Sequence, residues 1–244
     1  AAAVAWAAAS SARARDGKVA LFGVSVGGSL GLLAAVDPAL ADRVSVVGAI
    51  APYTSRREVI LLATTGYHHE NGRLARYAAT QFMSLVIARS LVSALPPGID
   101  RAVLLDRLHG VDDDAPRPLE VLRRPVAVPL RLETRAVLAL LRNRDPDRFP
   151  RLFARLSLRQ RLAIGRLSPL RLASGLRAPV ELLSAPRDKY FPPDESRLLA
   201  RRAPRARLTI TTTLGHAVPR LSWDDLAGLA RLNGALVRAL HAAS

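Results

Sequence analysis

A serine set among closely spaced glycines is the part of this chain best suited to chemistry. The stretch Gly23-Val24-Ser25-Val26-Gly27-Gly28 follows the apolar run Val19–Phe22 and precedes the small-residue run Ser29–Ala35. This order predicts a strand buried on both faces, a sharp turn and a helix. Such a turn pushes the serine hydroxyl out of the fold and brings a helix N-terminus beneath it. The candidate nucleophile is therefore Ser25.

The glycines of this stretch have a steric role in the same interpretation. A tight turn leaves no room for a Cβ atom two residues before or two residues after the serine. Those two positions are Gly23 and Gly27, and Gly28 is the third glycine of the predicted elbow.

A serine hydroxyl reacts slowly at neutral pH unless a base lies within hydrogen-bond reach. Histidine suits this task, and only His216 directly follows a predicted sheet strand. Loops at the carboxyl ends of parallel strands are where such sheets bind their ligands. The adjacent pair His68 and His69 fits no standard pattern of metal ligands, so we expect neither a metal nor another cofactor. His241 falls at the end of the last predicted helix, where a cation is mildly favoured.

The histidine in turn needs a carboxylate to hold its tautomer. Asp188 lies in the loop just beyond the predicted strand Val180–Leu183, whereas Asp194 is better explained as the N-cap of the next helix. The loop Ala51–Ser55, after the preceding strand, contains no carboxylate. We therefore expect Asp188 to be the acid.

The elements that must position these residues alternate between strand and helix in two parts of the chain, which predicts an α/β fold with a parallel sheet. The middle part reads as helical, broken by prolines, with almost no strand-like stretch. The expected strands are Val19–Gly23, Val44–Ile50, Val180–Leu183 and Arg207–Thr213. The expected helices are Ala1–Ala12, Gly27–Ala35, Gln81–Leu95, Leu132–Arg142, Phe149–Leu167, Asp194–Arg202 and Ser222–Leu240. In the last of these, Ser222 and Asp225 have capping-box spacing, and leucines 226 to 240 give one apolar face.

With the chain order Ser25, Asp188, His216, each after a separate strand, the sequence resembles the α/β-hydrolase superfamily. The resemblance also covers Leu176–Val180, Phe191-Pro192 and Pro204–Pro219. It implies a core formed by residues 1–55 and 168–244, with a helical cap or lid at residues 56–167. It further implies a catalytic triad, with the backbone N–H of Val26 as an oxyanion-hole donor.

One departure from the superfamily pattern stands out. The family sheet has about eight strands, with the nucleophile after the fifth, whereas here one helix precedes the nucleophile strand. We therefore expect a partial α/β-hydrolase sheet whose N-terminal strands are missing, along with the second oxyanion donor. The run Val19–Phe22 should then form an unpaired apolar edge.

Composition limits the remaining possibilities. The net charge is +16, but 34 of the 36 basic residues are arginines and they are dispersed, so we expect no nucleic-acid partner. The chain has no cysteine, and it contains no apolar run of the roughly 20 residues needed to span a bilayer. The Ala1–Ala9 start lacks the leading basic region of a secretory signal, and we expect a cytoplasmic protein.

These observations favour a serine hydrolase of the carboxylesterase type acting on a small-molecule acyl substrate. Acyl transfer and peptide cleavage stay open because the same triad serves them. A second hypothesis is a non-catalytic fold relative or binding module. A third and weaker one is a lipase that works at a membrane surface.

Overall fold

The computed structural model describes residues 17–216, 218–219 and 226–243. The chain divides into two compact units, one formed by Ala1–Arg56 with Gly165–Ser244 and the other by Arg57–Ile164. The first is called the sheet unit here and the second the helical unit. In the described residues, no helix is both long and apolar enough to cross a bilayer.

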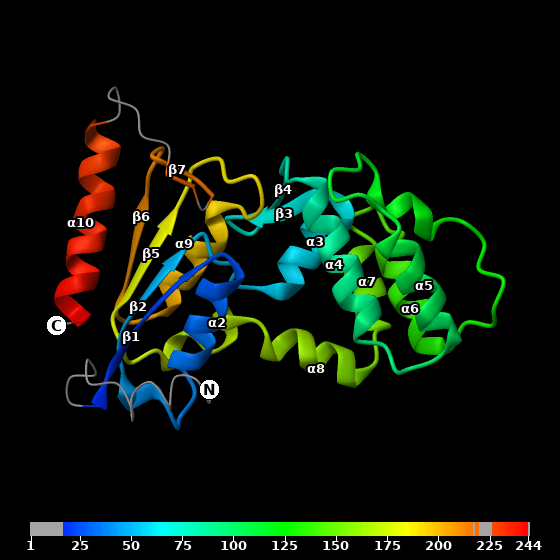
Figure 1. Cartoon of the computed structure of the whole chain (residues 1–244), viewed down its shortest axis with the longest axis horizontal. Coiled ribbons are helices and arrows are strands. Elements are labelled where there is room, and N and C mark those ends of the chain that lie inside the picture. The colour runs from blue at the N-terminus through cyan, green and yellow to red at the C-terminus, as the bar shows by residue number, and fades with distance from the viewer. Residues whose placement is uncertain (1–16, 217, 220–225, 244) are drawn as a thin grey trace. The chain divides into compact units, whose positions relative to one another are not determined.

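The sheet unit is built on four parallel strands in the order β1-β2-β5-β6 (Figure 1). The strands are β1 (Val19–Val24), β2 (Val44–Ile50), β5 (Val180–Ser184) and β6 (Ala206–Ile210). The longer connecting helices are α2 (Val26–Ala35) and α9 (Pro193–Arg202), and the unit ends with the hairpin strands β7 (Leu214–Gly215) and β8 (Val218–Pro219) and helix α10 (Leu226–Ala243). Short 3-10 turns lie at Ala41–Arg43, Pro169–Arg171 and Ala173–Gly175.

Side chains that alternate along the strands cover both faces of this sheet. On one face Val47 and Leu182 pack with Leu32 of α2 and Leu199 of α9 in a single core cluster. On the other face Leu183 packs with Ala235 of α10. Helices therefore lie on both faces of a parallel sheet, and the predicted α/β class with a parallel sheet is confirmed.

Strand β1 differs from the expectation that both of its faces are buried. Within the described residues it pairs only with β2, and the side chains of Phe22 and Val24 are 55% and 41% exposed. Leu21 points the other way and packs against the core beside α2. Because alternate residues of a strand face opposite sides, only one face of β1 is covered.

Helix α10 packs mainly through small residues, and only part of the expected leucine face, Leu232, packs against the core. Its buried positions are Gly228, Ala235 and Ala239, whereas Leu226 and Leu240 are exposed. Small residues allow the helix axis to approach the sheet closely. A bidentate ion pair between Arg238 of α10 and the buried Glu181 of β5 also links the helix to the sheet. The predicted helix Ala1–Ala12 and the capping pair Ser222 and Asp225 lie outside the described residues.

The helical unit contains most of the expected helices and a hairpin that the sequence analysis missed. Its helices are α3 (Arg56–Thr65), α4 (Gln81–Ser93), α5 (Ile99–His109), α6 (Leu132–Leu141), α7 (Phe149–Ala154) and α8 (Leu158–Arg166), with a 3-10 turn at Pro118–Leu122. Strands β3 (Tyr67–Glu70) and β4 (Arg73–Arg76) form the hairpin. Its two-residue turn is Asn71-Gly72, both with positive φ, the pairing that a type I′ turn requires.

The single helix predicted over Phe149–Leu167 is two helices, α7 and α8. The break occurs because Ser157 and Gln160 form a reciprocal cap at the start of α8. The Ser157 backbone N–H donates to the Gln160 side-chain oxygen at 2.9 Å, and the Gln160 N–H donates to the Ser157 hydroxyl at 3.3 Å.

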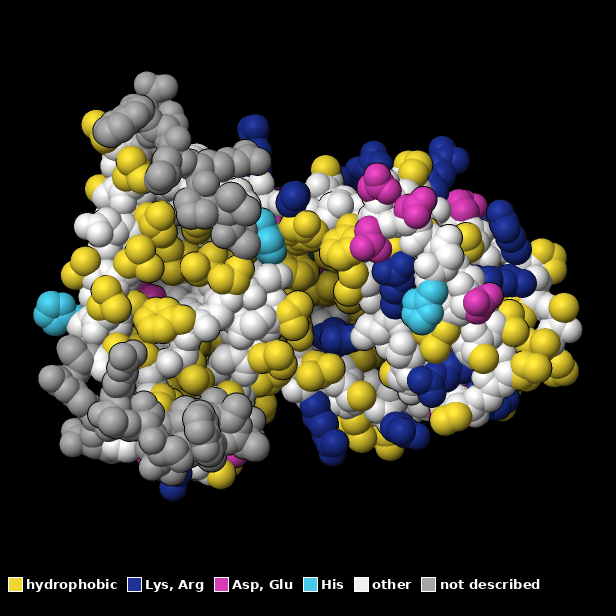
Figure 2. Space-filling model, viewed as in Figure 1, with side chains coloured by type: hydrophobic (Ala, Val, Ile, Leu, Met, Phe, Trp, Pro, Cys, Tyr) yellow, Lys and Arg dark blue, Asp and Glu magenta, His cyan; other side chains and the backbone are white. Residues whose placement is uncertain are grey.

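On the face drawn in Figure 2, the Lys and Arg side chains of the described residues are interspersed with acidic and hydrophobic ones. They do not gather there into one continuous basic stripe of the kind that follows a nucleic-acid backbone.

A buried carboxylate links α5 to the start of α6 within the helical unit. Asp100 accepts hydrogen bonds from Arg131 at 3.0 Å and 2.5 Å and from the Thr134 hydroxyl at 2.6 Å. The Arg131 bond is the main reason that the pKa of Asp100 lies well below its ordinary value of 3.8. The unfolded carboxyl takes up its proton at a higher pH than the folded one, so this contribution to stability is complete above pH 3.8 and is lost as the pH falls below it.

We predict that Asp100→Asn lowers the free energy of unfolding at pH 7 by about 1–3 kcal/mol, because it removes the charge of a carboxylate that accepts five hydrogen bonds. Urea unfolding of the variant and the parent at several pH values measures this. The difference between them should shrink below pH 3.8, where the parent carboxyl loses its advantage. A difference that is constant down to low pH would contradict this account.

Gly23, near the end of β1, and Gly27, in the first turn of α2, provide a matched pair of variants. A Cβ at Gly23 would lie 2.4 Å from the Gly27 carbonyl carbon, whereas a Cβ at Gly27 would meet nothing within 4 Å. We predict that Gly23→Ala destabilises the fold by about 1–3 kcal/mol. Gly27→Ala should instead stabilise α2 by up to about 1 kcal/mol. Thermal unfolding of both variants tests this, and equal losses from the two would refute it.

Candidate active site

Backbone hydrogen bonds continue past the strands and align their carboxyl ends. The Ser25 N–H donates to the Ile50 carbonyl at 2.7 Å, and the Ala51 N–H donates to Leu183 at 2.7 Å. The Thr211 N–H donates to the Ser184 carbonyl at 3.0 Å. All four strand ends therefore lie along one edge, which is where parallel sheets bind their ligands.

Ser25 lies on the turn between β1 and α2 with φ 54° and ψ −122°. This conformation is outside the ordinary regions for a residue with a side chain, and a bend held in this way is strained. Strain at such a turn is the feature expected of a nucleophile elbow. The Gly23 backbone lies against Gly27, since a Cβ there would have no space, so the steric explanation holds for Gly23. For Gly27 that explanation is wrong, because the space beside it is open.

Asp188 and His216 are joined by a buried hydrogen-bond pair. The His216 Nδ1 lies 2.7 Å from Oδ2 and 2.9 Å from Oδ1 of Asp188, and the two side chains are 10% and 1% exposed. The N–H groups of Tyr190 and Phe191 also donate to Asp188 Oδ1, at 2.7 Å and 3.0 Å. The carboxylate is thus oriented before it meets the imidazole. With Nδ1–H donating to it, the lone pair of Nε2 is left to act as a base.

Two aromatic rings lie close to the imidazole. The Tyr190 ring centroid lies 4.4 Å from that of His216, and the Phe191 centroid lies 5.9 Å away. Phe191 also meets Tyr53, edge to face, at 5.8 Å. The Tyr53 carbonyl accepts a 2.7 Å hydrogen bond from the Ser29 hydroxyl of α2. A continuous series of contacts therefore runs from His216 to the helix that follows Ser25.

A second buried carboxylate ties the loop after β2 to helix α9. Glu195 Oε2 accepts hydrogen bonds from the Thr54 N–H at 2.7 Å, the Thr54 hydroxyl at 2.8 Å and the Ser55 N–H at 2.7 Å. The loop that carries Tyr53 is thereby held against the helix that follows the Asp188 loop. Glu195 itself is 5% exposed.

The structure brings Asp188 and His216 together, and it places Ser25 and Val26 at the end of β1 and the start of α2. Within the described part of the chain, the Ser25 hydroxyl makes no hydrogen bond to His216. Nucleophile–base contacts are often long in free enzymes and shorten when substrate binds. Val26 is the first residue of α2, so its N–H is one of the donors that a helix start leaves without an intrahelical partner.

One positioning detail differs from the sequence analysis. Asp194 is not the N-cap of α9, which is Pro192, and lies inside the first turn as a partner of Arg197 at 3.1 Å. The rings of Tyr53, Tyr190 and Phe191 and the Glu195 clamp were not predicted. The Tyr190-Phe191 pair follows Asp188 directly, so its position beside the acid was a usable signal.

The remaining histidines have other surroundings. His69 Nδ1 lies 2.7 Å from Glu58, and the buried His68 ring meets Tyr77 at 5.3 Å. His109 and His241 are exposed. Among the described residues no group of three or more His, Asp or Glu side chains is placed to hold a metal ion.

Neither a protein-family model nor a curated protein matches the chain. The chain is similar to solved structures of hydrolases, three of which are described here. The meta-cleavage product hydrolase CumD from Pseudomonas fluorescens IP01 is 19% identical with a TM-score of 0.41, over 93% of this chain and 66% of that one. An alpha/beta fold family hydrolase from Bacillus anthracis str. Sterne is 12% identical with a TM-score of 0.44, over 91% and 67%. A thermophilic esterase from Thermogutta terrifontis is 16% identical with a TM-score of 0.39, over 91% and 65%.

The chain thus spans about two thirds of the length of these solved chains. The TM-scores of these structures are below 0.5. The assignment of the sheet unit to the α/β class is therefore based on the order and direction of its own strands.

We predict that the hydrogen bond from His216 to Asp188 gives a downfield imidazole N–H resonance in the proton NMR spectrum of the chain. Asp188→Ala should abolish it, because no acceptor then faces Nδ1. His216→Gln should abolish it as well and so assigns it. Asp188→Asn keeps an oxygen in place and serves as the conservative variant, with a retained but shifted signal. A resonance that is unchanged in Asp188→Ala would contradict the pairing.

Proposed function

We propose that this chain carries the Ser25-His216-Asp188 triad of a serine hydrolase that cleaves carboxylic esters or related acyl bonds. The observation that carries the proposal is the buried 2.7 Å contact between His216 Nδ1 and Asp188, at the sheet edge where Ser25 sits on a strained turn. Acyl transfer requires a carboxylate-bound imidazole that can reach the hydroxyl of the nucleophile, and the proposal assigns these parts to Asp188, His216 and Ser25.

The proposed reaction assigns one role to each group. The Ser25 oxygen attacks the acyl carbonyl while His216 Nε2 takes the hydroxyl proton. Asp188 holds the imidazole tautomer and stabilises the imidazolium that forms. The Val26 N–H donates to the oxyanion, aided by the N-terminus of α2. His216 then returns the proton to the leaving group, and water releases the acyl group from Ser25 by the same steps in reverse.

Other parts of the proposal rest on the sequence. The helical unit Arg57–Ile164 would serve as the cap over the substrate of an α/β-hydrolase. The reaction needs no cofactor, since the triad supplies nucleophile, base and acid. A small-molecule acyl substrate and a cytoplasmic location stay predictions.

The alternatives use the same fold. An acyltransferase or a peptidase would use the same three residues on a different acceptor or acyl bond. A non-catalytic binding module would have no need for the strained conformation of Ser25 or the oriented carboxylate of Asp188. Those two features favour the enzyme.

We predict that a fluorophosphonate probe labels the chain at Ser25. Ser25→Ala should remove the label, and His216→Ala should slow labelling by about 10³-fold or more because the base is lost. Ser174→Ala and His109→Ala are matched controls, since both residues are exposed and neither belongs to the proposed triad. Labelling is measured by intact mass. Undiminished labelling of Ser25→Ala would reject the triad and favour the binding module.

A further inference from the structure

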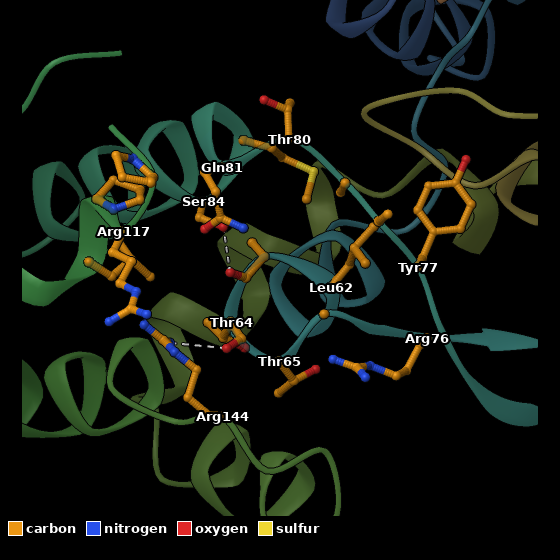
Figure 3. Close-up of a pocket in the computed structure, with 18 of the residues that line it drawn as sticks. Leu62, Thr64, Thr65, Arg76, Tyr77, Thr80, Gln81, Ser84, Arg117 and Arg144 are labelled. Atoms are coloured by element: carbon orange, nitrogen blue, oxygen red, sulfur yellow. Dashed lines mark hydrogen bonds between the residues drawn. The ribbon is translucent and has the colours of Figure 1, made fainter. Parts of the chain in front are cut away.

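The helical unit contains a hollow that the proposed hydrolysis does not use. It measures about 780 Å³, within the range of small-molecule sites, and lies between the end of α3, the β4–α4 connection and the segment before the 3-10 turn Pro118–Leu122 (Figure 3). Every residue that lines it belongs to the helical unit.

The charges around this hollow are unbalanced. Arg76, Arg117 and Arg144 line it together with one carboxylate, Glu120. Figure 3 draws Arg117 and Arg144 on one side of the hollow and Arg76 on another. Glu120 forms an ion pair at 3.5 Å with Arg123, and Arg123 is not one of the residues that line the hollow. In the described part of the chain, no carboxylate forms an ion pair with any of the three lining arginines.

Arg144 is held in place by the backbone around it. Its guanidinium donates to the carbonyls of Thr64 at 3.0 Å, Leu141 at 3.1 Å and Asn143 at 3.0 Å, all through one nitrogen. Desolvation and the like charge of Arg123 lower the pKa of Arg144 below its ordinary value, and the opposite charge of Glu120 offsets part of this. A guanidinium fixed through one nitrogen keeps its other N–H groups for a planar or tetrahedral anion.

The rest of the lining suits an anion with an apolar body. Helix α4 begins here, with Thr80 as its N-cap, so its positive end faces the hollow. Ser84, within α4, donates to the Ala63 carbonyl at 2.7 Å and fixes that wall. Leu62 and Met83 supply apolar surface.

We propose that this hollow is a binding site for a small organic phosphate, held by Arg76, Arg117 and Arg144 at its phosphate group and by the apolar lining at its body. Three guanidinium groups facing one paired carboxylate leave an excess positive charge that a dianion balances. The volume exceeds that of a bare ion, which leaves room for an organic group. All residues of the proposed site lie within the helical unit, so phosphate binding can be tested independently of the proposed triad.

The test is isothermal titration of the whole chain with phenyl phosphate, at an ionic strength high enough to screen the overall charge of +16. We expect saturable one-to-one binding. Arg117→Gln and Arg76→Gln should each weaken it by about tenfold, because each removes a charged donor without removing a hydrogen bond to the protein. Arg159→Gln, at an exposed position on α8 away from the hollow, removes the same charge and should leave the affinity unchanged.

Three outcomes would overturn the proposal. The first is no saturable binding of phenyl phosphate. The second is equal weakening by Arg159→Gln, which would mean that only the net charge attracts the probe. The third is equal affinity for benzoate, which would show that the site does not select phosphate. Circular dichroism and thermal unfolding of each variant confirm that a loss of binding is not a loss of fold.

Discussion

The hydrogen bond between His216 and Asp188 is the interaction on which the functional account depends. Hydrogen bonds from the backbone of Tyr190 and Phe191 orient the carboxylate, and the rings of the same two residues flank the imidazole. The loop after β5 thus supplies the acid, the N–H groups that orient it and the rings that confine its partner. The Asp188–His216 pair is therefore pre-organised, because its carboxylate and imidazole are already oriented toward each other.

Strained backbone conformations occur at the carboxyl ends of the strands, and this supports the assignment of the candidate active site to that edge of the sheet. Ser25, Ala51 and His216 have positive φ angles, although none is glycine, and each directly follows a strand. Conformations of this kind persist only where the surrounding structure enforces them, and they cluster at active sites. The ladder bonds at Ser25 and Ala51 and the Glu195 clamp on Thr54 supply that enforcement.

Much of the sheet unit could be predicted because its signals are local. The apolar runs that became β2 and β5 were found nearly to the residue, and the chain order Ser25, Asp188, His216 pointed to one sheet edge. The failures arose where tertiary packing decides. The leucines of α10 gave a clear periodic face, yet its fully buried positions are two alanines and a glycine, and of the leucines Leu232 packs against the core while Leu226, Leu236 and Leu240 are exposed. The edge position expected for Val19–Phe22 agrees with the strand order of the described residues, but the exposure of Phe22 was not predicted, because an apolar run does not reveal whether both faces of its strand are covered.

In the helical unit two usable signals were overlooked. Asn71-Gly72 marks a hairpin turn, and Ser157 with Gln160 marks a new helix start inside an apparently continuous helix. The clustering of Arg76, Arg117 and Arg144 had no such signal, since these residues lie far apart in the chain and only the fold brings them to one hollow. The same applies to Glu195 and Thr54.

The central claim is that the imidazole oriented by Asp188 serves the hydroxyl of Ser25. A crystal structure of the chain after reaction with a small phosphonate ester tests it most directly. The account predicts phosphorus bonded to the Ser25 oxygen, a phosphoryl oxygen facing the Val26 N–H, and His216 Nε2 within about 3.2 Å of the Ser25 oxygen or the departed group's position. A phosphonate attached to another residue, or an imidazole turned away from Ser25 with its Asp188 contact intact, would contradict it.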